Sequence, residues 1–330
     1  MKNIAVLGVD SLHGNELVRI LEQRNYPAEE IYFMSASEEF GEPIAFKDRL
    51  IEVHREYDLF ADQVDIVFCC LDKVRARAAV LEFKKKASVI DCSRAFSFAP
   101  DVKQVIPEVN PDTLTAHRTV IANPSPTTIQ LLMATYPLHE EFRLRCLHGT
   151  AFAAVSDLGQ DALRELSYEY EYLAVGNEVA KADDSFFPYK IGGNLIPQVG
   201  DFTSAGDTED EAVLTKEVQS ILNTEEIQLG ITAVYVPVKR GSCMVVYAGF
   251  EDHITVKDAR KILKKAPGVK IFDHDDEYPM PENVTGKDDV FVGRIRQDKV
   301  FENGLALWIA TDNLRKGSAL NAVQIAELLL

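Results

Sequence analysis

Ile4-Ala-Val-Leu-Gly8-Val-Asp-Ser11-Leu-His-Gly14 is the stretch that decides the fold. Its apolar start predicts a buried strand, and the residues after Gly14 have the apolar spacing of a helix. A glycine-bearing turn between strand and helix is typical of dinucleotide-binding domains, where the backbone approaches a pyrophosphate and the helix N-terminus attracts it. Here Ser11 occupies the middle glycine position, and Asp10 adds a negative charge. The stretch alone leaves nucleotide binding and a ligand-free connection equally open.

The chain has two parts that differ in their pattern of apolar and amphipathic stretches. Up to about residue 130, apolar runs alternate with amphipathic stretches, which predicts βα units around a mostly parallel sheet. In this part we expect strands at residues 4–9, 30–34, 65–70, 88–91 and 119–123. We expect helices at residues 14–23 and between 70 and 88, the latter with Val74, Ala78 and Leu81 on its inner face.

The remainder of the chain mixes longer helices and strands. We expect helices at residues 127–136, 163–173 and 256–265, and strands at 142–154, 232–238 and 243–250. Residues 177–206 and 273–289 have the composition of ordered loop excursions. The apolar segment 316–330 predicts a helix that packs on a core.

Composition excludes several classes of function. The 330 residues are 46% hydrophobic, enough for two cores, and the formal charge of -17 would repel the phosphates of a nucleic acid. The apolar N-terminal run stops at Asp10 with no cleavage-site pattern and is too short to cross a bilayer, so we expect a cytoplasmic protein with no membrane partner. The five cysteines have no CxxC spacing and the histidines no metal-ligand spacing, which predicts reduced, buried thiols and no metal site.

Several motifs follow one another over nearly the whole chain. They are Val105-Ile-Pro-Glu-Val-Asn110-Pro, Ile121-Ala-Asn-Pro124, Val236-Pro-Val238, Val292-Gly-Arg-Ile-Arg296 and Asp312-Asn-Leu-Arg-Lys-Gly317. In order and spacing they resemble the aspartate-semialdehyde dehydrogenase family. The resemblance implies an α/β fold: a Rossmann-like NAD(P)-binding domain of residues 1–130, completed by 312–330, and an α+β dimerisation domain of residues 131–311. It also implies a homodimer formed through the second domain.

The two residues that carry the family's chemistry are replaced. The family reduces aspartyl phosphate with a nicotinamide cofactor, and it needs a cysteine thiolate to form a thioacyl intermediate and a histidine to transfer protons. In the matching segments, Pro126 stands at the nucleophile position and Ser242 at the base position. Proline has no nucleophilic group, and a hydroxyl does not take up a proton at neutral pH. The resemblance therefore implies that the chain has no catalytic residues for this reaction.

The substrate pocket that the resemblance implies is also changed. The arginine that binds the substrate carboxylate corresponds to Tyr235, and the phosphate-binding arginine corresponds to Ser97. Neither replacement offers the bidentate donors of a guanidinium group. The active-site glutamine corresponds to Ala153 and a pocket lysine to Val213, whereas Glu211 matches the glutamate that holds the substrate amino group.

The residues at the expected cofactor-binding positions also differ from those of the family. Those that the resemblance retains as vestigial contacts are Gly8, Ser11, Gly14 and Asn313. Glu39 falls near the arginine that would pair with the 2′-phosphate of NADP, and a carboxylate there repels phosphate. Asp72 and Lys73 stand where the family has glycines. We therefore expect no bound cofactor, or NADP or NAD if there is one.

These replacements predict a catalytically degenerate relative, similar to the Usg-type bacterial proteins, that serves as a binding, assembly or regulatory dimer. One alternative is an NAD(P)-dependent oxidoreductase that acts on an aldehyde or oxo group of a different substrate in a rebuilt pocket. Its nucleophile would be Cys243, or Cys146 paired with His148. Another alternative is a mixed dimer with a homologous active subunit or a different protein.

Overall fold

The computed structural model describes residues 2–35, 41–55, 62–114, 119–177, 181, 185–272 and 276–330. The chain divides into two compact units, one of residues 1–125 with 318–330 and one of residues 126–317. Glu39 lies outside the described residues. In the described part of the chain, no helix has both the length and the apolar character needed to span a membrane.

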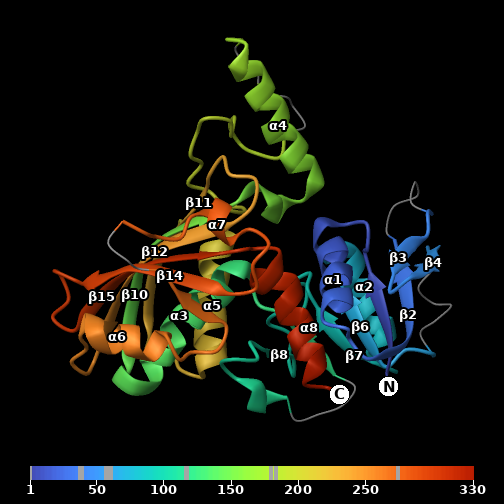
Figure 1. The fold of residues 1–330 in the computed structure, drawn as a ribbon, viewed down its shortest axis with the longest axis horizontal. Helices are drawn as coiled ribbons and strands as arrows, with labels where there is room; N and C mark the ends of the chain where they lie inside the picture. Colours follow the sequence, from blue (N-terminus) through green and yellow to red (C-terminus); the bar gives the residue numbers. More distant parts are fainter. Residues whose placement is uncertain are drawn as a thin grey trace. The chain divides into compact units, whose positions relative to one another are not determined.

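The first unit is built on a seven-stranded, wholly parallel sheet (Figure 1). Its strands are β1 (Lys2–Leu7), β2 (Ala28–Met34), β5 (Val53–His54), β6 (Ile66–Cys69), β7 (Ser88–Asp91), β8 (Lys103–Gln104) and β9 (Val120–Ala122). They run in the order β5-β2-β1-β6-β7-β9-β8. The chain proceeds outward from β1 first to one side and then to the other, so the topological switch point lies between β1 and β6. Strands β3 (Ile44–Phe46) and β4 (Arg49–Ile51) form a separate hairpin, and η2 (Pro111–Thr113) is a short 3-10 turn.

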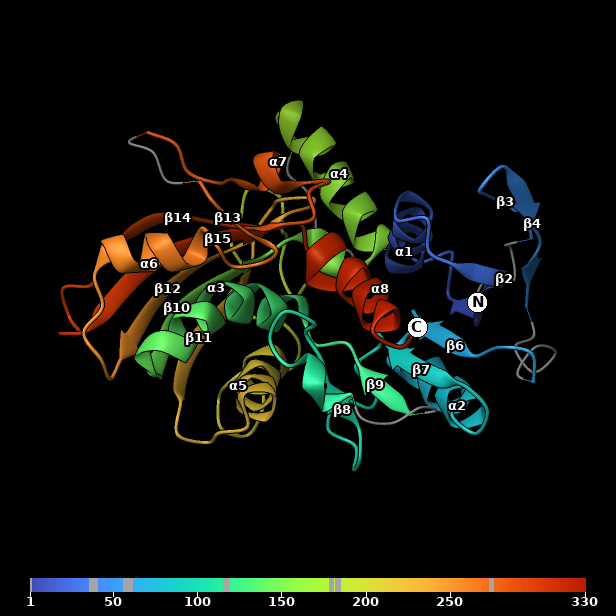
Figure 2. The same cartoon turned by 60° about the horizontal axis from the view of Figure 1, so that its bottom comes forward.

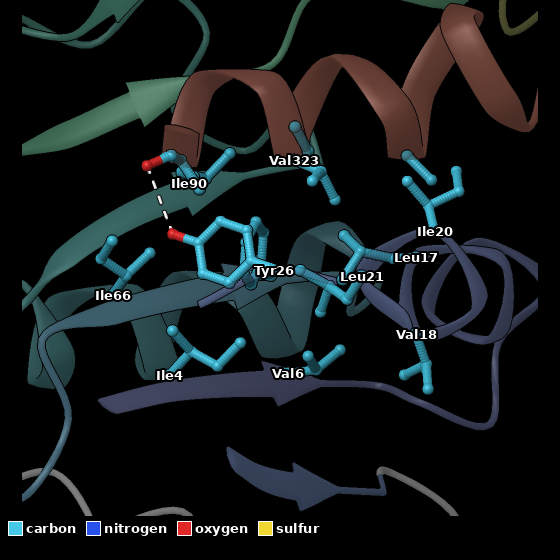
Figure 3. Close-up of a cluster of buried hydrophobic side chains, with 14 of the residues drawn as sticks. Ile4, Val6, Leu17, Val18, Ile20, Leu21, Tyr26, Ile66, Ile90 and Val323 are labelled. Atoms are coloured by element: carbon cyan, nitrogen blue, oxygen red, sulfur yellow. Dashed lines mark hydrogen bonds between the residues drawn. The ribbon is translucent and has the colours of Figure 1, made fainter. Parts of the chain in front are cut away.

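Helices cover both faces of this sheet. Helices α1 (Leu12–Gln23) and α8 (Leu320–Glu327) share one apolar cluster with Ile4 and Val6 of β1 (Figure 3). Helix α2 (Lys73–Phe83) packs in a second cluster with residues of β1 that point the opposite way. The hydroxyl of Tyr26 donates to the backbone carbonyl of Ala326 at 3.3 Å, which fixes α8 to the turn after α1. The C-terminal helix is therefore part of the core of the first unit.

The inner face predicted for α2 is wrong. Val74 is 80% exposed and Leu81 is 46% exposed, whereas Ala76, Val80 and Phe83 are buried. Every third or fourth residue from Ala76 faces the sheet, and that stripe contains two small alanines. Because charged and apolar residues are mixed around this helix, the apolar stripe is too weak to fix its phase from the sequence.

The second unit contains a six-stranded mixed sheet in the order β11-β10-β12-β15-β14-β13. The strands are β10 (Leu144–Ala153), β11 (Gln228–Tyr235), β12 (Ser242–Phe250), β13 (Val269–Ile271), β14 (Val290–Gln297) and β15 (Gly304–Thr311). Helices α3 (Pro126–Phe142), α5 (Glu209–Leu222) and α6 (Val256–Leu263) lie together on one side of this sheet (Figure 2). Helix α4 (Gln160–Ala174) follows the 3-10 turn η3 (Val155–Leu158) and extends away from the sheet (Figure 1). The shorter elements are α7 (Pro281–Val284) and a π-helical turn, η4 (Arg315–Ala319), before α8.

Candidate functional site

Pro126 is the first residue of α3. A proline suits this position because its fixed φ is helical and its missing N–H is not needed in the first turn. The ring is half-buried, and a Cβ built on Gly317 would lie 3.3 Å from the Pro126 Cβ. The position that the sequence assigns to the nucleophile thus holds an inert, half-buried ring, which a side chain on Gly317 would crowd.

Ser242 is the first residue of β12 and is buried. Its hydroxyl oxygen accepts a hydrogen bond from the backbone N–H of Ala154 at 3.1 Å. Its carbonyl oxygen accepts one from the side-chain amide of Gln130 at 3.2 Å, and the same amide donates to the carbonyl of Ile309 at 3.1 Å. Ser242 therefore connects β12 to the end of β10 and to α3, and it offers no group that titrates near neutral pH.

The two predicted substrate-pocket residues, Glu211 and Tyr235, are engaged within the second unit. Glu211 forms the carboxylate half of a capping box at the start of α5, where one of its oxygens accepts from the backbone N–H of Thr208 at 2.7 Å. Its other oxygen accepts from the backbone N–H of Ala233 at 2.8 Å. The ring of Tyr235 is buried and packs edge-to-face on Phe187, with centroids 5.4 Å apart. Both side chains thus have local structural roles.

Asn313 is completely buried in the second unit, just after β15. Its amide nitrogen donates to the hydroxyl of Ser156 at 2.8 Å and to the carboxylate of Asp157 at 2.5 Å. Its amide oxygen accepts from the backbone N–H of Gly241 at 2.9 Å. These bonds join η3, the turn before β12 and the segment after β15. They use both amide hydrogens and the oxygen of Asn313, the residue that the sequence predicted as a vestigial cofactor contact.

The glycine turn between β1 and α1 is closed by its own side chain. The hydroxyl of Ser11 accepts from the backbone N–H of Gly14 at 3.0 Å and donates to the carbonyl of Gly8 at 2.7 Å. A Cβ on Gly14 would lie 2.1 Å from the Gly8 oxygen, so glycine is required there for the helix to pack against the turn. Gly8 has φ +80°, a conformation that favours glycine. Both glycines are thus explained by the turn itself.

The comparisons with known proteins agree with this architecture. Residues 3–117 match the NAD binding domain of semialdehyde dehydrogenases, and residues 136–316 match their dimerisation domain. The aspartate-semialdehyde dehydrogenase of Aquifex aeolicus is 34% identical over 99% of this chain and 97% of its own length. The chain belongs to the aspartate-semialdehyde dehydrogenase family. Residues 1–330 therefore contain both domains of the family, in the family's order.

Other members of the aspartate-semialdehyde dehydrogenase family show the same full-length similarity. The Bacillus subtilis enzyme is 34% identical over 99% of this chain and 97% of its own length. The crystal structure of aspartate semialdehyde dehydrogenase II from Vibrio cholerae, complexed with ASA, superposes with a TM-score of 0.94 at 29% identity. That alignment covers 100% of this chain and 98% of the other. The predicted fold class, a Rossmann-like domain followed by a dimerisation domain, is confirmed.

The N-termini of α1 and α2 lie at the carboxyl edge of the first unit's sheet. Their N–H groups are candidates for binding the pyrophosphate of the nicotinamide cofactor that the aspartate-semialdehyde dehydrogenase family uses. At α1, the Ser11 hydroxyl already accepts from the Gly14 N–H. At α2, the carboxylate of Asp72 accepts from the N–H groups of Val74 at 2.9 Å and Arg75 at 3.0 Å. One N–H group in the first turn of α1 and two in the first turn of α2 thus already have side-chain acceptors, and Asp72 adds a negative charge beside α2.

The cysteines considered as relocated nucleophiles lie in the second unit. Burial raises the pKa of Cys243 to about 12, so its thiol is protonated at neutral pH. Cys146 and His148 are both half-buried on β10, and the His148 ring stacks on Tyr247 with centroids 4.9 Å apart. In this member of the aspartate-semialdehyde dehydrogenase family, the imidazole is therefore held by aromatic packing.

The structure brings together three residues of the first unit that sequence spacing does not connect. The ligand atoms of His13, Cys70 and Cys92 all lie within 4.8 Å of one another. Cys70 follows β6, Cys92 follows β7, and His13 lies in the first turn of α1. A hydrogen bond with Cys70 and burial together raise the pKa of Cys92 well above its usual value, so its thiol is protonated at neutral pH. No CxxC or HxxxC pattern marks this group, since only the parallel sheet makes its members neighbours.

Proposed function

We propose that this chain is a catalytically degenerate, Usg-like member of the aspartate-semialdehyde dehydrogenase family that acts in the cytoplasm as a non-catalytic binding, assembly or regulatory dimer. The observation that carries the proposal is the state of the two chemical positions. Pro126 places a half-buried ring with no nucleophilic group at the start of α3, and the Ser242 hydroxyl accepts the backbone N–H of Ala154. A thioacyl intermediate needs a thiolate at the first position and a proton acceptor at the second.

The proposed homodimer forms through the second unit. Residues 136–316 match the dimerisation domain of semialdehyde dehydrogenases. Helix α4 and the residues after it carry large apolar side chains on the surface, which a partner would cover. These exposed residues are Tyr168, Tyr172, Leu173, Val175 and Tyr189. Dimer formation needs none of the catalytic groups, so it is compatible with their loss.

Turnover and cofactor affinity test the proposal. The purified chain is assayed for phosphate-dependent oxidation of aspartate semialdehyde by NADP and by NAD, beside an active family enzyme such as that of Bacillus subtilis. We expect no rate above the blank. Isothermal titration with the same two nucleotides should give weak or no binding, since Ser11 and Asp72 cap the two helices. Turnover at an ordinary enzymatic rate would overturn the proposal.

A second candidate function is an oxidoreductase that acts on an aldehyde or oxo group of a different substrate. It is favoured by the match of residues 3–117 to an NAD binding domain and by the intact switch point between β1 and β6. Micromolar affinity for NADP or NAD in the titration, without oxidation of aspartate semialdehyde, would select this candidate. Co-purification of a homologous active subunit with the tagged chain would instead indicate a mixed dimer.

A further inference from the structure

His13, Cys70 and Cys92 form a compact donor set in the first unit. Their ligand atoms lie within 4.8 Å of one another, and Cys70 is buried while the other two are half-buried. A tetrahedral Zn²⁺ has Zn–S distances of about 2.3 Å and Zn–N distances of about 2.0–2.1 Å, so its ligand atoms lie roughly 3.5–3.8 Å apart. The three atoms would thus need to approach one another by roughly 1.3 Å at most, a shift within reach of side-chain rotations.

The backbone that carries the two sulfurs is held by the parallel sheet. The N–H of Cys70 donates to the carbonyl of Leu7 at 2.9 Å, and the N–H of Cys92 donates to the carbonyl of Cys69 at 3.0 Å. The Ser11 hydroxyl lies 3.3 Å from the carbonyl oxygen of Cys70. Donors on rigid, hydrogen-bonded backbone keep their spacing without a metal, which lowers the cost of binding one.

The imidazole of His13 is held in place by a hydroxyl from the returning C-terminal segment. The Ser318 hydroxyl lies 2.8 Å from Nε2 and 3.1 Å from Nδ1 of His13. The hydroxyl therefore contacts the ring at both nitrogens and restricts its rotation. Ser318 precedes α8, so the returning helix positions this ligand.

We propose that His13, Cys70 and Cys92 form a binding site for a soft divalent metal ion of the zinc class, with one coordination position left for water or a small ligand. Two cysteine sulfurs, whose thiol protons are released to solvent as the metal binds, and an imidazole favour Zn²⁺ over Mg²⁺ or Ca²⁺. Three protein ligands with an open fourth position are the arrangement of reactive zinc sites. The site lies at the carboxyl edge of a doubly wound sheet beside its switch point, where such sheets bind ligands. It does not depend on whether the chain is a catalyst.

Cobalt titration of the full chain tests the site. The reduced, chelator-treated protein is titrated with Co²⁺, whose thiolate-to-metal charge transfer and visible bands report tetrahedral sulfur ligation. We expect one Co²⁺ per chain, displaced by Zn²⁺. The variants Cys70→Ser, Cys92→Ser and His13→Gln should each raise the Kd for Co²⁺ by at least about 100-fold, and Ser318→Ala should raise it by about 10-fold. Cys146→Ser and His253→Gln, in the second unit, are the matched controls and should leave the Kd unchanged.

Thiol protection in the unmodified chain tests the site without substitutions. Alkylation followed by mass spectrometry should show that Zn²⁺ slows modification of Cys70 and Cys92 and leaves that of Cys146 unchanged. The site is refuted if Co²⁺ gives no charge-transfer band, if the Cys146 control weakens binding as much as the Cys92 variant, or if all cysteines are protected equally. A Cys70–Cys92 disulfide in protein prepared under reductant would also refute it.

Discussion

The hydroxyl oxygen of Ser242 accepts the backbone N–H of Ala154 at 3.1 Å, in the interior of the second unit. Ser242 thus has a structural role, which bears on any attempt to restore the family's catalytic pair of cysteine and histidine. We expect the double variant Pro126→Cys, Ser242→His to remain near zero in the aspartate semialdehyde assay, because Tyr235 and Ser97 still replace the arginines. Ser242→Ala, which restores nothing, should lower the free energy of unfolding by about 1–3 kcal/mol by leaving the Ala154 N–H without its partner. Substantial turnover by the double variant would show that the rest of the pocket is intact.

Glu211→Gln tests whether this carboxylate is structural. Its two oxygens accept the N–H groups of Thr208 and Ala233, and an amide accepts only one of them. We expect a loss of about 1–2 kcal/mol in the free energy of unfolding, measured by urea titration with circular dichroism. Glu225→Gln, on the exposed turn after α5, should have no effect. Equal stability of the two variants would leave Glu211 available for a ligand.

Asn313→Asp places a carboxylate beside Asp157, whose oxygen now accepts the Asn313 amide at 2.5 Å. Asn313 is buried whereas Asp157 is exposed, so solvent screens part of the repulsion between the two carboxylates, and we expect a destabilisation of about 1–3 kcal/mol at neutral pH from the buried carboxylate and its lost donor bonds. Adding Asp157→Asn should recover part of that loss, because a donor and an acceptor then face each other again. A double-mutant cycle of urea midpoints measures the coupling. Additive losses would mean that the two side chains do not interact.

Ser11→Gly and Ser11→Ala separate capping from cofactor binding. The hydroxyl caps α1 through the Gly14 N–H, so alanine should cost about 1 kcal/mol and glycine only a few tenths. We expect Ser11→Gly to leave NADP affinity weak, because Asp72 still caps α2. A gain of more than about 100-fold in affinity would assign the loss of binding to Ser11 alone.

His139 makes the stability of the chain depend on pH. Burial lowers its pKa from the ordinary 6.5, and its Nδ1 accepts the backbone N–H of Leu144 at 3.1 Å. The unfolded chain therefore takes up a proton first as pH falls below 6.5, and the stabilisation is lost on acidification through the lowered pKa. His139→Asn keeps an acceptor that does not titrate. Between about pH 8 and pH 5 it should lose less stability than the unmodified chain, and equal losses would contradict this assignment.

The fold was predictable where burial leaves a continuous apolar signal. Strand β7 has the predicted bounds, Ser88–Asp91, because a central parallel strand is buried on both faces. Helix α5 was not among the predicted elements, although Thr208 and Glu211 form a capping box and Leu214, Val218 and Ile221 form its buried stripe. Those signals are in the sequence and would have identified the helix.

The sequence predicts which residue stands at each position of the candidate site, but not how these residues are arranged in space. The replacements at Pro126 and Ser242 are visible in the sequence, but their packing and hydrogen bonds are not. The cluster of His13, Cys70 and Cys92 lies beyond sequence reasoning, since its members come from three segments that meet only when β1, β6 and β7 align. Spacing rules detect ligands on one turn or hairpin, and they do not detect ligands gathered by a parallel sheet.

The docking of α8 on the first unit has a consequence for synthesis on the ribosome. Residues 1–125 are translated first, and they lack Leu320, Val323 and Ile325 of their apolar cluster until residues 126–317 have been translated. During that interval one face of the nascent sheet is incompletely covered. Its apolar side chains are then exposed to chaperones or to association with other chains. The unit that is translated second, residues 126–317, is therefore the one whose residues are complete first.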